Sequence, residues 1–309
     1  MPQEPNLFVL GFQKCGTTTI TDMLAAHPDV FIPSIKETYF FLNRAKSGVT
    51  TYKEYVREYF RAARPTHKFV GEGTPFYACD TGAMERLTEA VDMSASRFIL
   101  VLRDPTKRAY SAYWHSKRLG RESLTFEQAL DQEDRRVAED KAAGESWWRF
   151  AYAGVGHYDE HVARVLRFVP RDQLLIIDDL DVIPYQTVRD RLSSFLGISA
   201  QQFPADRPQS NMASMPKSRA VQSMVIGKNP VKRFVSRIIP REMRTALGRY
   251  FLKLNSVETS YPPLNPATRD RLRAYFEPHL RATETLVGTD LSRWIGKATE
   301  PEAVLDTGR

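Results

Sequence analysis

Four short apolar runs divide the first part of the chain, and the hydrophobic positions between them recur mainly at helical spacing. The runs cover residues 6–11, 67–71, 97–102 and 173–177. Short apolar runs rich in β-branched residues are typical of strands that are buried on both faces. Strands that alternate with helices form parallel sheets, so the pattern predicts an α/β fold with a parallel β-sheet flanked by helices on both faces.

Local signals indicate where several helices begin and end. Residues 17–26 form one candidate, which the following His-Pro pair ends. Asp104 can cap a second helix that reaches about residue 117, and Pro105 can occupy its first position. Further helices are predicted at residues 124–144, 158–168 and 191–196, the last of them stopped by Gly197.

The pattern changes after Pro204, where proline, serine, asparagine and basic residues become frequent. Residues 228–254 form a basic, intermittently amphipathic stretch. We therefore expect a single domain over residues 1–298, with a core at about 6–219 and a C-terminal helical portion at about 220–298. Residues 299–309 are predicted to form a loose tail.

The composition is that of a globular protein, but it does not indicate a function. The chain has 309 residues, 42% of them hydrophobic and 26% charged, which is ordinary for a globular protein. The net charge of +7 suits an anionic ligand or an acidic surface, but many proteins with this charge bind neither. Two cysteines are too few for a disulfide framework and are not spaced for zinc, so we predict a reducing compartment and no metal site. The start has no leader-like pattern and no apolar run approaches about 20 residues, which predicts a cytoplasmic protein.

The sequence GFQKCGTTT, residues 11–19, lies between the first strand and the first helix and looks like a phosphate-binding loop. In a Walker A loop a lysine follows the last glycine, but here Lys14 precedes Gly16 and Thr17 takes the usual lysine position. The N–H groups of residues 16–19, at a helix N-terminus, can hold a phosphate, and the Thr17 and Thr18 hydroxyls add donors. Lys14 would then point at whatever is attached to that phosphate.

A second phosphate site is predicted at the end of the third run. Arg103 ends that strand and Ser111 follows two helical turns later, in the pattern R-D-P-x-x-R-x-x-S-x-Y. A guanidinium and a hydroxyl at one edge of a sheet suit a phosphate, and ligands of such sheets bind at the carboxyl ends of the strands. Two phosphate sites on different strands indicate a nucleotide phosphorylated at both ends rather than a triphosphate.

These motifs resemble those of the sulfotransferases that use 3′-phosphoadenosine-5′-phosphosulfate (PAPS) and release 3′-phosphoadenosine-5′-phosphate (PAP), in particular the glycan-type, heparan-sulfate-type and bacterial branch. The loop at 11–19 is similar to their 5′-phosphosulfate loop, and residues 103–113 are similar to their 3′-phosphate motif. Further similarity covers SIKETYFF at 34–41, GEGTPFY at 71–77, residues 175–180 with 195–197, and PKSR at 216–219. The resemblance implies a P-loop-like sulfotransferase fold and a nucleotide site formed by Lys14, Cys15, Gly16, Thr17, Thr18, Thr19, Arg103, Ser111, Lys217, Ser218 and Arg219.

The chemistry of sulfo transfer explains the displaced lysine. The transferred group is a monoanion that needs no Mg²⁺, and charge develops on the bridging oxygen of the leaving phosphate. Lys14 can donate to that oxygen, and losing such a donor costs about 3 kcal/mol by analogy with oxyanion holes. The acceptor must also lose a proton, and the resemblance implies that Glu37 is the base that takes it. The alternative interpretation of Glu37 is a solvated ion pair with Lys36.

Three further residues are candidates for contact with substrate. Lys36 could bind the sulfuryl oxygens or be exposed, and Glu72 could contact substrate, orient a neighbour or form structural hydrogen bonds. His115 lies one turn beyond Ser111 and could act as a base, although a packed or capping histidine is the simpler interpretation. Cys15 lies in the phosphate loop, where a small residue that fills the turn is also the simpler interpretation.

The predicted function is O-sulfo transfer to an acceptor that the sequence does not identify. A glycan, a lipid or a hydroxylated small molecule all fit, no nucleic-acid partner is expected, and the oligomeric state stays open. The basic residues 228–249 could touch a membrane or an anionic acceptor, or form a solvated helix face. One alternative is a Mg²⁺-dependent P-loop kinase, but the loop has no Gly-Lys-[Ser/Thr]. The other is a catalytically inactive nucleotide-binding module that docks on a membrane or an acidic partner.

Overall fold

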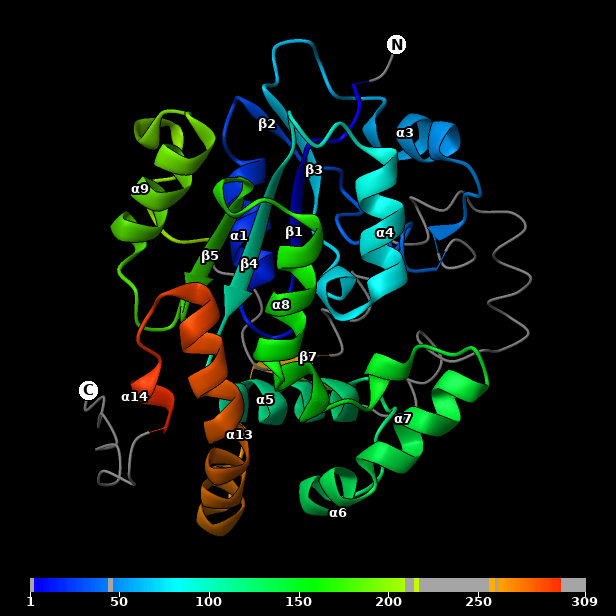
Figure 1. The fold of residues 1–309 in the computed structure, drawn as a ribbon, viewed down its shortest axis with the longest axis vertical. Coiled ribbons are helices and arrows are strands. Elements are labelled where there is room, and N and C mark those ends of the chain that lie inside the picture. Colours follow the sequence, from blue (N-terminus) through cyan, green and yellow to red (C-terminus); the bar gives the residue numbers. More distant parts are fainter. Residues whose placement is uncertain (1–2, 44–46, 209–213, 217–255, 259–260, 296–309) are drawn as a thin grey trace.

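A five-stranded parallel sheet forms the centre of the protein, as the sequence predicts (Figure 1). The computed structural model describes residues 3–43, 47–208, 214–216, 256–258 and 261–295. The strand order is β2-β3-β1-β4-β5, and every pairing within this sheet is parallel. The strands are β1 (Leu7–Gly11), β2 (Val30–Phe31), β3 (Phe69–Glu72), β4 (Arg97–Leu102) and β5 (Leu174–Asp178).

The predicted strands agree with the observed ones to within two residues at each end. β4 has the predicted bounds, and β1 is buried along its whole length. β3 extends one residue further than expected, to Glu72, because this carboxylate is buried among hydroxyl groups instead of facing water. β2 was not predicted, since two residues carry no readable periodicity.

Helices cover both faces of the sheet, with α4 (Thr81–Ala90) and α8 (Tyr158–Phe168) in front of it and α1 (Thr17–Ala25) behind it in Figure 1. α8 has the predicted bounds. α3 (Tyr52–Phe60) begins at a capping box in which Thr51 and Glu54 bond each other's backbone N–H groups. α9 (Tyr185–Leu196) ends at Gly197, whose φ of 62° is the left-handed conformation that favours glycine.

Helix α5 (Pro105–Arg118) begins as the sequence predicts. The Asp104 carboxylate accepts hydrogen bonds from the N–H groups of Thr106 and Lys107, and Pro105 takes the first helical position. The predicted helix at 124–144 is instead two, α6 (Phe126–Asp131) and α7 (Glu133–Ala142). The break at Gln132 lets Glu133 turn inward, where its buried carboxylate accepts the N–H groups of Ala153 and Gly154.

The C-terminal part contributes α13 (Pro266–Val287), which packs on α8 and α5, and α14 (Ser292–Ile295). A short antiparallel pair, β6 (Ser214–Pro216) and β7 (Ser256–Glu258), lies beside α5 through β6. The remaining short elements are the 3-10 turns at Tyr77–Cys79, Trp147–Arg149, Gly154–Gly156, Arg171–Gln173 and Ala200–Gln202. The basic stretch 228–249 and the predicted tail at 299–309 lie outside the described residues.

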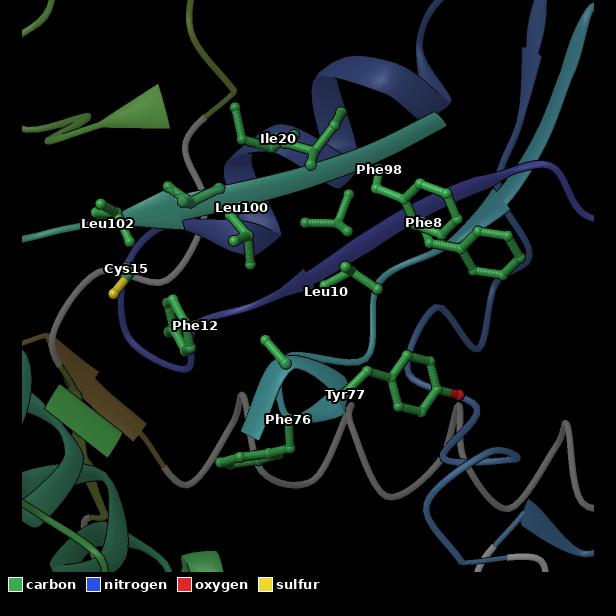
Figure 2. Packing of buried hydrophobic residues seen from close by; sticks show 14 of the residues in the cluster. Phe8, Leu10, Phe12, Cys15, Ile20, Phe76, Tyr77, Phe98, Leu100 and Leu102 are labelled. Carbon is green, nitrogen blue, oxygen red and sulfur yellow. The ribbon is translucent and has the colours of Figure 1, made fainter. Parts of the chain in front are cut away.

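The core is built on the sheet and reaches the loop that follows β1. Phe8 stacks on Phe98 across the β1–β4 pair, with ring centroids 5.7 Å apart. Figure 2 shows Phe12 and Cys15 at one end of this core, where β4 ends at Leu102. Because each fully buried large apolar side chain contributes roughly 1.5–3 kcal/mol, the loop is anchored by the same packing that stabilises the sheet.

Candidate functional site

The strand order decides which loops share the carboxyl-end edge of the sheet. β1 lies between β3 and β4, and β5 lies beyond β4. The loop after β1 is therefore central, the segment after β3 lies to one side of it, and the segments after β4 and β5 lie to the other. Ligands of parallel α/β sheets bind at this edge, so the candidate site is built from these four connections and from the segment after β2, which pairs with β3 and leads to Glu37.

The loop after β1 presents an open helix N-terminus. Gly16 is the N-cap residue of α1, with a φ of 93°, and no side chain caps the helix. The first helical hydrogen bond runs from the Ile20 N–H to the Gly16 carbonyl, so the N–H groups of Thr17 and Thr18 point out of the helix end. A β-carbon on Gly16 would come within 2.6 Å of Leu180 Cδ1, and the positive φ disfavours any residue with a side chain there. The arrangement supports the predicted phosphate-binding role of Gly16, Thr17, Thr18 and Thr19.

Lys14 lies at the centre of the site in a left-handed conformation, with a φ of 67°. Burial and the nearby guanidinium groups of Arg118 and Arg103 lower the pKa of Lys14 from 10.5 to about 8, whereas the Glu37 carboxylate acts in the opposite direction. The ammonium group is thus mainly protonated at neutral pH but desolvated and repelled by cations. An anionic ligand strongly stabilises such an ammonium group. A residue that donates a hydrogen bond to the leaving group needs this strong interaction with negative charge.

The segment with Glu37 is held against the end of β3. The Gly73 N–H donates to the Lys36 carbonyl over 2.9 Å, and a β-carbon on Gly73 would come within 2.5 Å of Thr21. The Tyr39 hydroxyl donates to Glu37 Oε2 over 2.9 Å. Burial and the Glu37 charge raise the pKa of Tyr39 well above 10, so the phenol keeps its proton and orients the carboxylate. The Glu37 charge acts on Lys14, whose pKa it raises, and the role of Glu37 as base stays a prediction.

The ring of Tyr39 also connects Glu37 to a cluster of aromatic rings. It stacks on Trp148 with a ring-centroid distance of 6.4 Å, and Trp148 stacks on Phe76 at 5.0 Å. These rings come from three separate segments, so their contact could not be read from the sequence.

Glu72 does not reach the open part of the site. Its side chain is 1% exposed, and both carboxylate oxygens are occupied by groups of the protein itself. Oε2 accepts the Thr38 and Thr74 hydroxyls at 2.8 and 2.7 Å, and Oε1 accepts the Tyr55 and Tyr77 hydroxyls at 2.7 and 2.9 Å. Burial raises the pKa of Glu72, while these hydroxyl donors oppose the shift. The candidate substrate contact is therefore corrected to a positioning role, because Glu72 fixes Thr38 next to Glu37.

Replacing Glu72 by glutamine should destabilise the protein and lower turnover together. The amide nitrogen cannot accept the hydrogen bonds that one carboxylate oxygen accepts, and an unsatisfied buried group costs about 1–3 kcal/mol. Urea unfolding combined with steady-state kinetics tests this expectation. Thr51→Ala, which removes the cap of α3 at a cost of about 1 kcal/mol, is the control for stability loss alone. Turnover that falls no further in Glu72→Gln than in Thr51→Ala would contradict the positioning role.

Lys36 points toward α1. Its ammonium group donates to the Thr21 hydroxyl over 3.2 Å and lies 3.7 Å from an Asp22 oxygen. Burial lowers the pKa of Lys36, and the Asp22 and Glu37 charges oppose the shift. A direct contact between Lys36 and the sulfuryl oxygens stays a prediction, but its present contacts connect the Glu37 segment to α1.

His115 lies near Lys14 but is poorly suited to act as a base. Arg118 donates to His115 Nδ1 over 3.1 Å, and since an arginine can only donate, Nδ1 must be the unprotonated nitrogen of the ring. Burial and the charges of Lys14, Arg118 and Arg121 lower the pKa of His115 to about 3. A neutral imidazole with this pKa can donate a hydrogen bond through Nε2, but it takes up a proton weakly.

The predicted 3′-phosphate residues lie on the β4 side of the site. The Arg103 guanidinium donates from Nη1 to the Lys14 carbonyl over 3.2 Å, which connects it to the phosphate loop. Nε and Nη2 both lie 2.7 Å from Asp181 Oδ2. Ser111 is half-buried, two turns along α5. The sequence analysis missed Asp181, which lies beyond the end of β5 and meets Arg103 only because β4 and β5 are neighbours in the sheet.

Cys15 departs from the predicted nucleotide contact. Its N–H donates to the Phe12 carbonyl over 3.1 Å, and its buried thiol lies 3.3 Å from the Tyr158 hydroxyl. Burial raises the pKa of the Cys15 thiol to about 11. Tyr158 in turn donates to the Arg103 carbonyl over 2.9 Å, so Cys15 packs the phosphate loop against the Arg103 segment.

The remaining predicted nucleotide residues, Lys217, Ser218 and Arg219, lie outside the part of the chain that the structure describes. Residues 214–216, directly before them, form β6 beside α5. The predicted loop therefore begins next to the helix that carries Ser111.

Away from this site, one group of described residues has metal-ligand chemistry. His157, Glu160 and His279 place potential ligand atoms within 4.8 Å of one another. The two imidazole rings stack at 4.1 Å, His157 Nε2 lies 2.8 Å from the Tyr275 hydroxyl, and His279 Nδ1 lies 2.9 Å from Asp159 Oδ1. We interpret the group as packing between α8 and α13. Among the described helices, none is long and apolar enough to cross a membrane.

Comparison with known proteins gives one consistent result. The sequence matches the model of the sulfotransferase domain over residues 4–283. It is 25% identical over 308 residues to the human bifunctional heparan sulfate N-deacetylase/N-sulfotransferase 3, covering 96% of this chain and 30% of that protein. It is 27% identical over 203 residues to the mouse heparan sulfate glucosamine 3-O-sulfotransferase 3B1, covering 63% of this chain and 47% of that protein.

A solved structure extends the similarity to three dimensions. The crystal structure of a sulfotransferase from Alicyclobacillus acidocaldarius superimposes with a TM-score of 0.68 at 25% identity, covering 94% of this chain and 99% of that one. This similarity assigns the sheet and its loops to the P-loop-like sulfotransferase fold. The chain spans less than half the length of these curated relatives.

Proposed function

The chain belongs to the sulfotransferase domain family, and we propose that it moves the sulfo group of PAPS to an acceptor hydroxyl and releases PAP. The observation that carries this proposal is the meeting of Lys14, Glu37 and Arg103 around one open helix N-terminus. Three different connections of the sheet supply these residues. A phosphate loop, a carboxylate and a separate arginine site are the parts that sulfo transfer from a doubly phosphorylated nucleotide requires.

Each residue has a defined part in the proposed reaction. The N–H groups of α1 hold the 5′-phosphate, and Arg103 with Ser111 holds the 3′-phosphate. The acceptor oxygen attacks the sulfur while the bond from sulfur to the bridging phosphate oxygen breaks. Glu37 takes the acceptor proton, and Lys14 donates to the bridging oxygen as negative charge develops there. The transferred group is a monoanion, so no step needs a divalent metal.

We propose a hydroxyl as the acceptor group, whose proton the Glu37 carboxylate would take during the attack, although an amine would also lose a proton as its bond to sulfur forms. An amine is the alternative acceptor, because relatives of this chain are named for both O-sulfo and N-sulfo transfer to heparan sulfate. We propose a glycan as the first acceptor to test, ahead of a lipid or a hydroxylated small molecule. The half-buried rings of Tyr39 and Trp148, backed by the buried Phe76, are compatible with this choice, since a sugar ring can pack one face on an aromatic ring.

The test is transfer of ³⁵S from labelled PAPS, in EDTA, to matched acceptors that differ only in the reacting group. Heparan-type oligosaccharides with free hydroxyls and either N-acetylated or unsubstituted amines separate oxygen from nitrogen transfer. We expect label in the N-acetylated oligosaccharide and equimolar PAP. Label only in the free amine would replace the hydroxyl acceptor by an amine. PAPS that binds tightly without transfer to a glycan, a lipid alcohol or a phenol would favour the inactive binding module.

Cytoplasmic location, membrane contact through residues 228–249 and a role for Lys217, Ser218 and Arg219 stay predictions. The kinase alternative has less support, because Thr17 stands where a kinase loop needs its lysine and Arg103 would have no task in it.

A further inference from the structure

The guanidinium that we assign to the 3′-phosphate is already occupied by a carboxylate of the same chain. Nε and Nη2 of Arg103 both lie 2.7 Å from Asp181 Oδ2, and Nη1 donates to the Lys14 carbonyl. A carboxylate that receives two charge-assisted contacts from one guanidinium occupies the edge that a phosphate would use. Asp181 therefore has the geometry of a competitor for the nucleotide.

The segment that carries Asp181 is held firmly at the donor site. The Asp179 N–H donates to the Leu102 carbonyl over 2.9 Å, and the Asp179 side chain accepts the Trp294 indole N–H over 2.8 Å. The next residue, Leu180, is buried and packs against Gly16 of the phosphate loop. The carboxylate of Asp181 is thus kept at Arg103 by its backbone, and it stays nearby when a phosphate arrives.

The side chain of Asp181 is poorly placed for a structural role. It is 51% exposed, and its partner Arg103 is 25% exposed. Ion pairs at this level of exposure contribute little to folding stability. A negative charge next to a phosphate-binding arginine does affect ligand affinity, however, because it offsets the positive potential that attracts the phosphate.

We propose that Asp181 weakens the hold of Arg103 on the 3′-phosphate and thereby speeds release of the product nucleotide. This inference rests on the proposed function, since it takes the 3′-phosphate of PAP as the ligand of Arg103. Asp181 acts mainly through Arg103, although its charge also reaches Cys15 in the phosphate loop. It would set the balance between capture of the donor and release of PAP, with a much smaller effect on the 5′-phosphate than on the 3′-phosphate.

The test is Asp181→Asn, which keeps the size of the side chain and one acceptor oxygen but removes the charge. We expect PAP to bind on the order of tenfold more tightly in calorimetry and to dissociate correspondingly more slowly in stopped-flow experiments. Affinity for adenosine 5′-phosphate, which lacks the 3′-phosphate, should change less than about twofold. Asp172→Asn is the matched control, because it removes the same exposed charge next to the opposite end of β5.

The outcomes separate the proposal from the function on which it rests. Wild-type protein that binds PAP well, with Asp181→Asn unchanged or weaker, would overturn the competitor role and leave the proposed function standing. If Asp181→Asn raised the affinity for PAP and for adenosine 5′-phosphate equally, or if Asp172→Asn raised the affinity for PAP as much, the effect would come from net charge alone. Either result would also overturn the competitor role. Wild-type protein that shows no preference for PAP would overturn both.

Discussion

Glu37→Gln should lower the rate of sulfo transfer by about two to four decades and leave the affinity for PAP nearly unchanged. Glutamine keeps the size of the side chain and can still accept the Tyr39 hydrogen bond, but it has almost no basicity. The expected loss is the contribution of a general base to the transition state. Single-turnover transfer measures it directly, because product release does not enter the rate.

A matched control separates this effect from charge and folding. Glu58 is an exposed glutamate on α3, so Glu58→Gln should transfer sulfate at the parent rate. If Glu37→Gln stays within a few-fold of the parent enzyme, Glu37 is not the base. His115 would then need a pKa in the complex far above its present value of about 3 to replace it.

Lys14→Ala should lower turnover by about 10²–10³-fold and also weaken binding of the donor. The alanine variant loses the donor to the bridging oxygen, where charge develops as the sulfur–oxygen bond breaks. Lys107→Ala is the control, since it removes an exposed positive charge from the first turn of α5. A Lys14→Ala enzyme with weaker binding but unchanged single-turnover rate would limit Lys14 to a binding role.

The lowered pKa of Lys14 adds a pH signature to this prediction. The protonated form acts as donor, so kcat/KM for PAPS, which reports the free enzyme, should fall as pH rises through about 8. In the donor complex the phosphates favour the charged form, and the alkaline limb of kcat should lie at higher pH. Lys14→Arg keeps its charge to much higher pH, so any activity that it retains should lack the limb near 8.

Local patterns predicted most of the sheet and the phosphate loop. The apolar run of β4 and the Asp104–Pro105 start of α5 are signals contained within a few residues, and both agree with the structure. The order of Lys14, Gly16 and Thr17 likewise indicates a phosphate-binding loop from the sequence alone. Such features need no knowledge of distant contacts.

Contacts between distant segments explain what the sequence did not reveal. Glu72 looked available for substrate because the hydroxyls that surround it come from Thr38, Tyr55, Thr74 and Tyr77. The pairing of Arg103 with Asp181 spans 78 positions and depends on β4 and β5 being neighbours. In both cases the residue type was visible, but its partners were set by the fold.

The most direct test of the account is calorimetric binding of nucleotides to the wild-type protein in EDTA. Because charge-assisted hydrogen bonds to a phosphate are worth roughly 1.5–3 kcal/mol, PAP should bind about tenfold to a hundredfold more tightly than adenosine 5′-phosphate. ATP with Mg²⁺, measured separately without chelator, should bind more weakly than PAP. Arg103→Ala should erase most of the preference for the 3′-phosphate. Tighter binding of ATP with Mg²⁺ than of PAP would contradict the account and favour a kinase.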